Sequence, residues 1–317
     1  MNDAAAKAAE ETEADICCAN CGIAGVDDIT LQECNDCDLV KYCGDMCQKN
    51  HREQHEEECN KRKALLHDRK LFTQPDETHR GECPLCFLPM PIDPRKFAFY
   101  ACCSQYICKG CGYANRKSYI NDPMIEAMSC PFCREPAATG KKENKKRMMK
   151  RVKANDPAAM KEMGLTCYEE GDYGGAFEYL TKAAKLGDFD SHYHLGALYG
   201  EGHGVEKDAE KSIHHYEKAA IGGHPYARYS LSYLEEKNGN TERAVKHAII
   251  AANLGHENSM KALWTHYSRG SITKEDLDAT LRTHQAAINA TKSEERKVAE
   301  KGVSESKADY WRRIGLV

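Results

Sequence analysis

Residues 34–59 read CNDCDLVKYCGDMCQKNHREQHEEEC. This stretch contains five cysteines and His55 at paired spacings of three or four residues, and the pair Cys18-x2-Cys21 precedes it. Zinc prefers four nitrogen or sulfur ligands in a tetrahedron, and a Cys-x2-Cys turn presents two thiolates together. Spacings of four residues suit a helix, because positions i and i+4 lie on one face. Eight ligands therefore predict two zinc sites.

The order of these ligands, with Tyr42-Cys43 and Cys47-Gln48, resembles the MYND zinc finger over residues 18–59. The resemblance implies two interleaved, closed, structural sites. One is expected to contain Cys18, Cys21, Cys43 and Cys47, and the other Cys34, Cys37, His55 and Cys59. It also implies docking of proline-containing peptides.

Three neighbouring residues fall outside this ligand set. Cys17 is left over, because the spacing favours Cys18 as the ligand. Arg52 stands where the family usually has a tryptophan, and His51 is interpreted as a solvated surface residue.

A second cysteine pattern follows at Cys83-x2-Cys86, Cys102-Cys103, Cys108-x2-Cys111 and Cys130-x2-Cys133. Eight cysteines again predict two zinc sites, for four zinc ions in the chain. The pattern resembles a RING domain, in particular RINGs with eight cysteines. That resemblance implies one zinc on Cys83, Cys86, Cys108 and Cys111, and a second on Cys102, Cys103, Cys130 and Cys133. Ligation by both adjacent residues, Cys102 and Cys103, needs a bent backbone, so one of them could be idle.

Ubiquitin ligases of the RING class contain no nucleophile and act by orienting a charged conjugating enzyme. The resemblance implies that Leu85 and Pro131 form the apolar docking surface, and that Arg134 contacts ubiquitin. Alternatively, Leu85 and Pro131 merely pack the knuckles and Arg134 is a solvated charge, in which case the domain only binds.

The third part of the sequence, residues 154–290, has almost no cysteine and contains a repeat. Ala183-Ala184 recurs as Ala219-Ala220 and as Ala251-Ala252, and Ala286-Ala287 is a weaker fourth return. A period of this length predicts stacked helical hairpins in which each unit buries its apolar face against its neighbours. Small residues let the paired helices approach closely, and a glycine ends the second helix. The segment Tyr199–Ala220 resembles the Sel-like repeat, a relative of the tetratricopeptide.

The composition describes an ordinary protein, with a net charge of −4 and no long apolar run. The N-terminus lacks the features of a signal peptide, so a cytoplasmic or nuclear location is expected. Cysteine pairs in a reducing compartment favour metal ligation over disulfides. The basic run 141–153 is interpreted as the exposed face of a helix, and nucleic acid is not expected as the main partner.

The predicted fold class is two small zinc-stabilised α+β modules followed by an all-α helical-hairpin solenoid. Two functions are considered: an adaptor that binds proteins or peptides through its MYND, RING-like and repeat surfaces, or a RING-type ubiquitin ligase whose other modules select the substrate. No catalytic residue and no cofactor other than zinc is expected for the adaptor. The predicted order is a disordered acidic lead-in (1–16), the MYND finger (17–59), a helical spacer (60–80), the RING-like domain (81–138), a basic linker or helix (139–153), the repeats (154–290) and a charged tail (291–317).

Overall fold

The computed structural model describes residues 17–23, 25, 30–121 and 129–301, so the predicted lead-in lies outside the described residues. The chain divides into two compact units, Met1–Thr73 and Gln74–Val317. None of the helices in the described part of the chain is long and apolar enough to cross a membrane.

The described residues of the first unit form two very short strands and one long helix. Strand β1 (Gln32–Glu33) pairs antiparallel with β2 (Lys41–Tyr42), and α1 (Asp45–Leu71) follows. The buried cluster consists of cysteines and one aromatic residue: Cys18, Cys34, Cys37, Tyr42 and Cys59. The core of this unit is therefore made largely of the predicted zinc ligands.

Helix α1 carries both the last ligands and most of the spacer. The sequence predicts a helical spacer over about residues 60–80, and in the structure the helix in this region ends at Leu71. The chain then runs to residue 80 without a helix. The Gln74-Pro75 pair explains part of this difference, since a residue before proline is pushed out of the helical region.

The second unit begins with the RING-like module. A short 3₁₀ helix, η2 (Pro94–Lys96), leads into the hairpin of β3 (Phe97–Tyr100) and β4 (Gln105–Cys108), which pair antiparallel with Phe97 opposite Cys108. Helix α2 (Lys109–Asn121) begins directly after β4. The core of this module combines Cys83, Met90, Phe97, Ile107 and Cys108.

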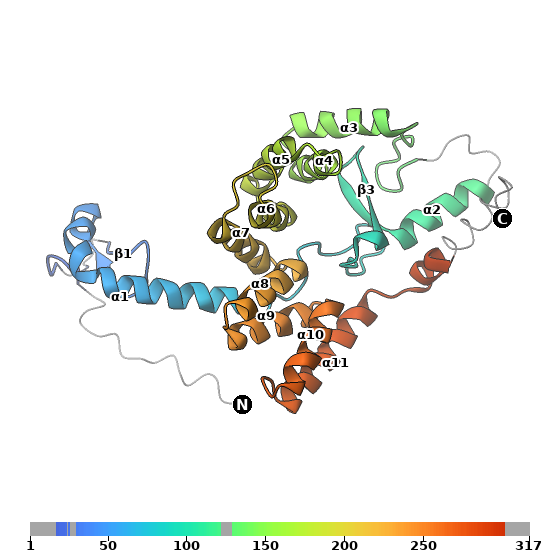
Figure 1. The fold of residues 1–317 in the computed structure, drawn as a ribbon. Coiled ribbons are helices and arrows are strands. Elements are labelled where there is room, and N and C mark those ends of the chain that lie inside the picture. Colours follow the sequence, from blue (N-terminus) through green and yellow to red (C-terminus); the bar gives the residue numbers. More distant parts are fainter. Residues whose placement is uncertain (1–16, 24, 26–29, 122–128, 302–317) are drawn as a thin grey trace. The chain divides into compact units, whose positions relative to one another are not determined.

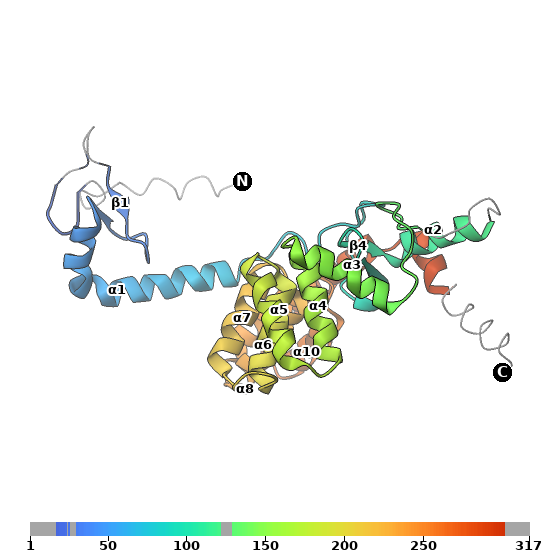
Figure 2. The same cartoon turned by 90° about the horizontal axis from the view of Figure 1, so that it is seen from above.

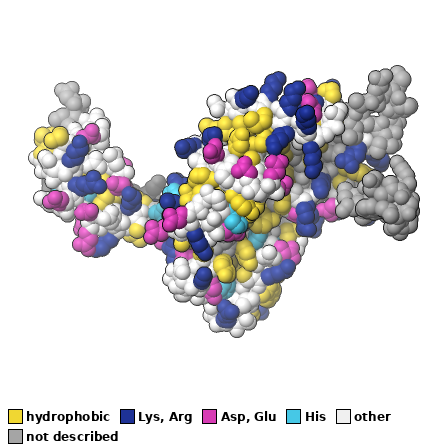
Figure 3. All heavy atoms as spheres, turned by 45° about the horizontal axis from the view of Figure 1, so that its top comes forward, with side chains coloured by type: hydrophobic (Ala, Val, Ile, Leu, Met, Phe, Trp, Pro, Cys, Tyr) yellow, Lys and Arg dark blue, Asp and Glu magenta, His cyan; other side chains and the backbone are white. Residues whose placement is uncertain are grey.

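The basic run forms α3 (Lys141–Lys153), which precedes the solenoid. Its Lys and Arg side chains are mostly exposed, but Met148 is buried. Figure 3 shows basic side chains gathered on this part of the unit. The helix is therefore amphipathic, and its apolar side packs against Ala101, Ala159 and Met163.

The solenoid consists of four helical hairpins that stack in an arc (Figures 1 and 2). The β3–β4 hairpin lies at the open side of the arc. The helices of the successive hairpins are α4 (Pro157–Glu169) with α5 (Tyr173–Lys185), α6 (Phe189–Glu201) with α7 (Ala209–Ile221), α8 (Pro225–Lys237) with α9 (Thr241–Asn253), and α10 (Glu257–Ser268) with α11 (Lys274–Ala290).

Small residues allow the two helices of a hairpin to approach, as predicted. A Cβ atom at Gly196 would meet the ring of Tyr216 at 2.7 Å, so only glycine fits there. The alanine pairs that mark the repeat are buried in the first three units: Ala183, Ala184, Ala219, Ala220, Ala251 and Ala252. In the fourth return, Ala286 is exposed and Ala287 is half-buried, which matches its weaker signal.

Part of the predicted charged segment 291–317, interpreted as a frayed helix or tail, is helical in the structure. Residues 294–301 are helical, and Arg296 is only 7% exposed. This helix lies beside α2 in both ribbon views (Figures 1 and 2), because Arg296 packs against Gly110. The rest of the predicted tail, with Trp311, lies outside the described residues.

Each hairpin begins with the same cap. The residue before the first helix accepts a hydrogen bond from a backbone N–H in the first turn, which satisfies one of the free donors at the helix end. This residue is aspartate twice and histidine twice: Asp156, Asp188, His224 and His256. A residue with positive φ precedes each cap, Asn155 in the first unit and a glycine in the others.

A buried carboxylate connects the solenoid to the segment before the RING-like module. Oδ1 of Asp190 on α6 accepts from Nε2 of His79 at 2.9 Å and from Nε2 of His224 at 3.0 Å. Arg80 and Lys161 also pair with this carboxylate, each at 2.9 Å. Burial alone would raise the pKa of Asp190, but the charges of Lys161 and His79 hold it well below its ordinary value. Asp190 is therefore ionised and tightly held.

The histidine caps make the solenoid sensitive to acid. Nδ1 of His256 must be unprotonated to accept the N–H of Ser259. Burial lowers the pKa of His256 to about 4, whereas an unfolded histidine has a pKa of about 6.5. Burial likewise lowers the pKa of His224 to about 3. As the pH falls below about 6.5, the unfolded state takes up protons that the folded state does not, so stability decreases.

We therefore expect His256→Asp to reduce the acid sensitivity of the protein, since aspartate caps other repeats. Between about pH 6 and pH 5 the variant should lose roughly 1 kcal/mol less stability than the wild type. Urea unfolding followed by circular dichroism at several pH values measures this. His67→Asp, at an exposed histidine of α1 outside the solenoid, is the matched control and should keep the wild-type pH dependence. An unchanged pH dependence in His256→Asp would contradict the cap mechanism.

Candidate metal centres

The structure brings all sixteen predicted ligands together in four groups. Within each group the ligand atoms lie within 4.8 Å of one another. The groups are Cys18, Cys21, Cys43 and Cys47; Cys34, Cys37, His55 and Cys59; Cys83, Cys86, Cys108 and Cys111; and Cys102, Cys103, Cys130 and Cys133. Cys17 belongs to none of them, and Cys102 and Cys103 lie in the same group.

The separations between ligand atoms are those of a zinc tetrahedron. A Zn–S bond of about 2.3 Å places two sulfurs of a tetrahedron about 3.8 Å apart. The sulfurs of Cys34 and Cys59 lie 3.8 Å apart, and those of Cys86 and Cys108 also lie 3.8 Å apart. In the fourth group, Cys103 lies 3.7 Å from Cys130 and Cys102 lies 3.4 Å from Cys133. The donor sets fit zinc, and four protein ligands leave no open position for a catalytic water.

Three of the five Cys-x2-Cys turns share one backbone geometry. In each of these three the residue after the second cysteine has positive φ and donates its N–H to the carbonyl of the first cysteine. These bonds join Gly22 to Cys18 at 2.8 Å, Phe87 to Cys83 at 2.9 Å, and Arg134 to Cys130 at 2.9 Å. The turn points both thiols to the same side, which explains how so short a stretch supplies two ligands.

Within a group the thiols do not ionise equally in the absence of a cation. Burial would raise the pKa of Cys34, but backbone hydrogen bonds at Asp36 and Cys37 lower it. Burial and hydrogen bonds to Cys37 and Cys34 raise the pKa of Cys59 to about 12. A divalent cation is what allows such thiols to lose their protons together, so metal binding releases protons and weakens in acid.

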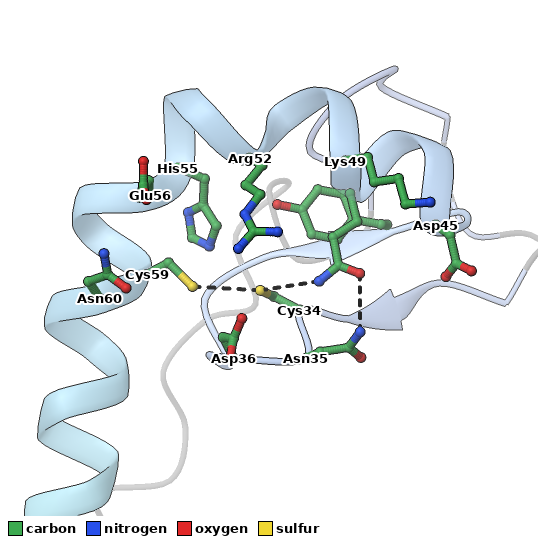
Figure 4. Close-up of a pocket in the computed structure, with 12 residues that line it drawn as sticks. Cys34, Asn35, Asp36, Asp45, Lys49, Arg52, His55, Glu56, Cys59 and Asn60 are labelled. Atoms are coloured by element: carbon green, nitrogen blue, oxygen red, sulfur yellow. Dashed lines mark hydrogen bonds between the residues drawn. The ribbon is translucent and has the colours of Figure 1, made fainter.

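A pocket of about 370 Å³ lies beside the second group of the MYND finger (Figure 4). Cys34, Tyr42, Gln48 and Arg52 are among its lining residues. Arg52, at the family's tryptophan position, extends from α1 into the pocket (Figure 4). It makes no hydrogen bond or ion pair with another residue in the part of the chain that the structure describes. The pocket is therefore polar and offers a free guanidinium.

His51 is not the solvated residue expected from the sequence. It is half-buried, and its Nδ1 lies 3.0 Å from the hydroxyl of the buried Tyr42. Its ring also stacks on His55 at 5.7 Å between centroids. His51 thus supports a zinc ligand, which its position one helical turn before His55 could have suggested.

The three residues considered for ligase activity all lie on the cysteine turns. Leu85 and Pro131 are half-buried, and Leu85 packs against the core of its module. Arg134 is exposed and adopts a φ of 61°. The part of the chain between these turns includes residues 122–128, which lie outside the described residues.

Two arginines from distant segments contact the RING-like groups, and sequence reasoning missed both. Nη2 of Arg296 lies 3.4 Å from the sulfur of Cys86, and Nη1 donates to the carbonyl of Pro89 at 2.8 Å. Arg151 of α3 donates to the carbonyl of Cys103 at 3.2 Å. Such outer contacts orient ligands and offset thiolate charge. No local spacing signals them, because the partners lie far apart in the sequence.

A fifth group joins His79, Asp190 and His224. Two histidines and one carboxylate could bind a metal. However, Arg80 and Lys161 already pair with the same carboxylate, and two fixed cations disfavour a third. This group is better explained as a structural anchor.

Comparison with known families identifies the module before the RING-like module and the repeats after it. Residues 18–59 match the family model of the MYND finger, and residues 157–188, 189–224 and 225–256 each match the Sel1 repeat. The chain thus contains a zinc-binding MYND finger followed by three Sel1 repeats, two kinds of module that generally mediate protein–protein interaction. The RING-like module is suggested by its cysteine groups.

Individual proteins share shorter parts. Chitin synthase regulatory factor 4 of Schizosaccharomyces pombe is 30% identical over 103 residues, covering 30% of this chain and 16% of that protein. Putative beta-lactamase HcpC of Helicobacter pylori is 39% identical over 56 residues, covering 18% of this chain and 19% of that protein. The chain thus spans less than a fifth of either relative.

Two solved structures are also similar. A Sel1 repeat protein from Oxalobacter formigenes has 25% identity and a TM-score of 0.41, covering 52% of this chain and 79% of that chain. The protective antigen c5321, present in uropathogenic Escherichia coli strains and displaying an SLR fold, has 18% identity and a TM-score of 0.39, covering 61% of this chain and 41% of that chain.

The geometry predicts that Cys102 and Cys103 are both ligands. We expect elemental analysis of the purified protein to find about four zincs, since each site takes four ligands. Cys102→Ser and Cys103→Ser should each lower the zinc content by about one ion, because three remaining ligands hold zinc weakly. Cys17→Ser is the control and should keep the full content. Full zinc content in either Cys102→Ser or Cys103→Ser would show that the residue is idle.

Proposed function

We propose that the protein is an interaction adaptor that uses its zinc modules and repeats as separate binding surfaces. The observation that carries this proposal is that all four ligand groups are closed by four protein side chains each. Closed sites hold structure rather than activate water. The zinc ions then fix surfaces in place, and the surfaces bind other proteins.

The MYND finger is the first of these surfaces, with the pocket in Figure 4 as its peptide site. MYND fingers dock proline-containing peptides, which supports a ligand of this kind. Arg52 replaces the apolar contact of a tryptophan with five N–H donors. A suitable peptide therefore presents a carbonyl or carboxylate oxygen next to its proline, where the guanidinium can donate to it.

Binding of labelled proline-containing peptides to the full chain tests this, with fluorescence anisotropy as the measurement. We expect saturable binding that weakens at least tenfold in Arg52→Ala, since a charged hydrogen bond contributes roughly 1.5–3 kcal/mol. Lys70→Ala, at an exposed position near the end of the same helix, is the control. Equal binding by Arg52→Ala and the wild type would show that this pocket is not the peptide site.

A RING-type ubiquitin ligase is the second candidate. The observation in its favour is Arg134, which is exposed directly after the last cysteine and keeps a left-handed backbone. The left-handed backbone belongs to the turn, as at Phe87, and it leaves the Arg134 side chain exposed. Leu85 and Pro131 would then contact the conjugating enzyme.

A ubiquitylation assay with a broad panel of conjugating enzymes distinguishes the two candidates. A ligase should build ubiquitin chains with at least one enzyme, and Arg134→Ala should reduce the rate strongly, because the arginine would hold the donor ubiquitin. If the protein is only an adaptor, we expect no ubiquitin chains with any conjugating enzyme of the panel. Formation of ubiquitin chains that depends on Arg134 would therefore contradict the adaptor proposal and support the ligase.

A further inference from the structure

A groove of about 880 Å³ lies between the RING-like module and the solenoid, within the second unit. One wall is the segment from residue 76 to η2, and the other is formed by the α9–α10 turn and the end of α11. Pro89, Pro91, Leu254 and Ile288 are among the apolar lining residues. The groove is distinct from the MYND pocket, which belongs to the first unit.

The groove is rimmed by carboxylates without partners. Asp76, Glu77 and Glu82 line it, are exposed, and form no ion pair with any residue in the described ranges. Glu257 adds a fourth exposed carboxylate, whose contact with Lys261 on the same helix is long at 3.9 Å and exposed. Such a contact contributes little, so this charge is also largely available.

The two cations of the groove are outnumbered by its carboxylates, and each already lies beside one in an exposed contact. Arg95 pairs with Asp93 at 3.0 Å, and Lys96 pairs with Glu300 at 2.9 Å. Five lining carboxylates therefore face two lining cations that are both engaged. The groove has a negative rim around an apolar floor.

We propose that this groove binds a basic peptide segment of a partner protein, with Lys or Arg residues interleaved with apolar ones. Aliphatic stems of Lys and Arg pack well on apolar surface while their charged ends reach carboxylates. Charge-assisted hydrogen bonds to the rim would set the register, and the prolines and Ile288 would accept the apolar side chains. This inference names the partner chemistry for one surface of the adaptor and rests on that proposed function.

A metal ion is a poorer occupant of the groove than a peptide. The rim carboxylates do not converge into a ligand group among the described residues, whereas the cysteine groups do. The chain's own helix α3 is also excluded. Its Arg147 and Arg151 are bound to the carbonyls of Pro136 and Cys103, so this basic run is fixed elsewhere.

The test uses the full chain and labelled, proline-free peptides in which Lys or Arg alternates with Leu, measured by fluorescence anisotropy. Matched peptides with Glu in place of the basic residues should not bind. We expect the double variant Glu77→Lys with Glu82→Lys to weaken binding at least tenfold, and added salt to weaken wild-type binding. The milder pair Glu77→Gln with Glu82→Gln should give a smaller loss in the same direction.

The matched control reverses two exposed carboxylates elsewhere on the solenoid, Glu178→Lys with Glu242→Lys, which changes the net charge equally. This control should bind the basic peptides as the wild type does. An equal loss in both double variants would mean attraction by overall charge and would overturn the groove. Zinc content and circular dichroism of every variant must match the wild type.

Two further outcomes would contradict the proposal, and a parallel measurement separates it from the proposal for the MYND pocket. Tighter peptide binding after removal of residues 302–317 would indicate that the chain's own C-terminal segment competes for the groove. If the wild type self-associates and the double variant Glu77→Lys with Glu82→Lys does not, the occupant of the groove is a second copy of the chain. Proline-containing peptides report on the MYND pocket in the same samples, so failure of that pocket and failure of this groove are read independently.

Discussion

Coordination of zinc by clustered thiolates is the constraint on which the MYND finger depends. Its strands are two residues long, and its buried cluster is formed by ligands and Tyr42. A segment of this size cannot bury enough apolar surface to fold alone, and structural zinc supplies roughly 10–16 kcal/mol. The consequence reaches the proposed function, because Cys34 and Cys59 also line the pocket that we propose as the peptide site. The pocket therefore exists only while the metal holds its walls together.

Local patterns explain what could be predicted from the sequence. Ligand spacing such as Cys18-x2-Cys21 and the returning alanine pairs depend on neighbours within one turn or one hairpin, so the MYND finger and the repeats were both recognisable. The contacts of Asp190 and Arg296 were not. His79 lies 111 residues from Asp190, and Cys86 lies 210 residues from Arg296. Periodicity carries no information about such pairs, which depend on how completed elements meet.

The caps of the solenoid show how one structural need is met by different side chains. Asp188 and His256 hold equivalent positions, and each accepts a backbone N–H in the first turn of its helix. Aspartate does so as an anion, whereas histidine does so only when neutral. His224 also donates to Asp190, which an aspartate there would repel. The repeat therefore tolerates exchange at this position only where the surroundings provide the matching charge.

The contact of Arg296 with the first RING-like turn has a consequence for biosynthesis. The cysteines of that turn leave the ribosome long before Arg296 does, since domains form from the N-terminus during synthesis. Closing a loop of this length is entropically costly, so the contact forms late. Until then the carbonyls of Leu88 and Pro89 lack the guanidinium that they accept from in the finished protein. A ribosome-bound nascent chain would thus carry an incomplete module, open to chaperones or competing metals, until the helix at residues 294–301 is made.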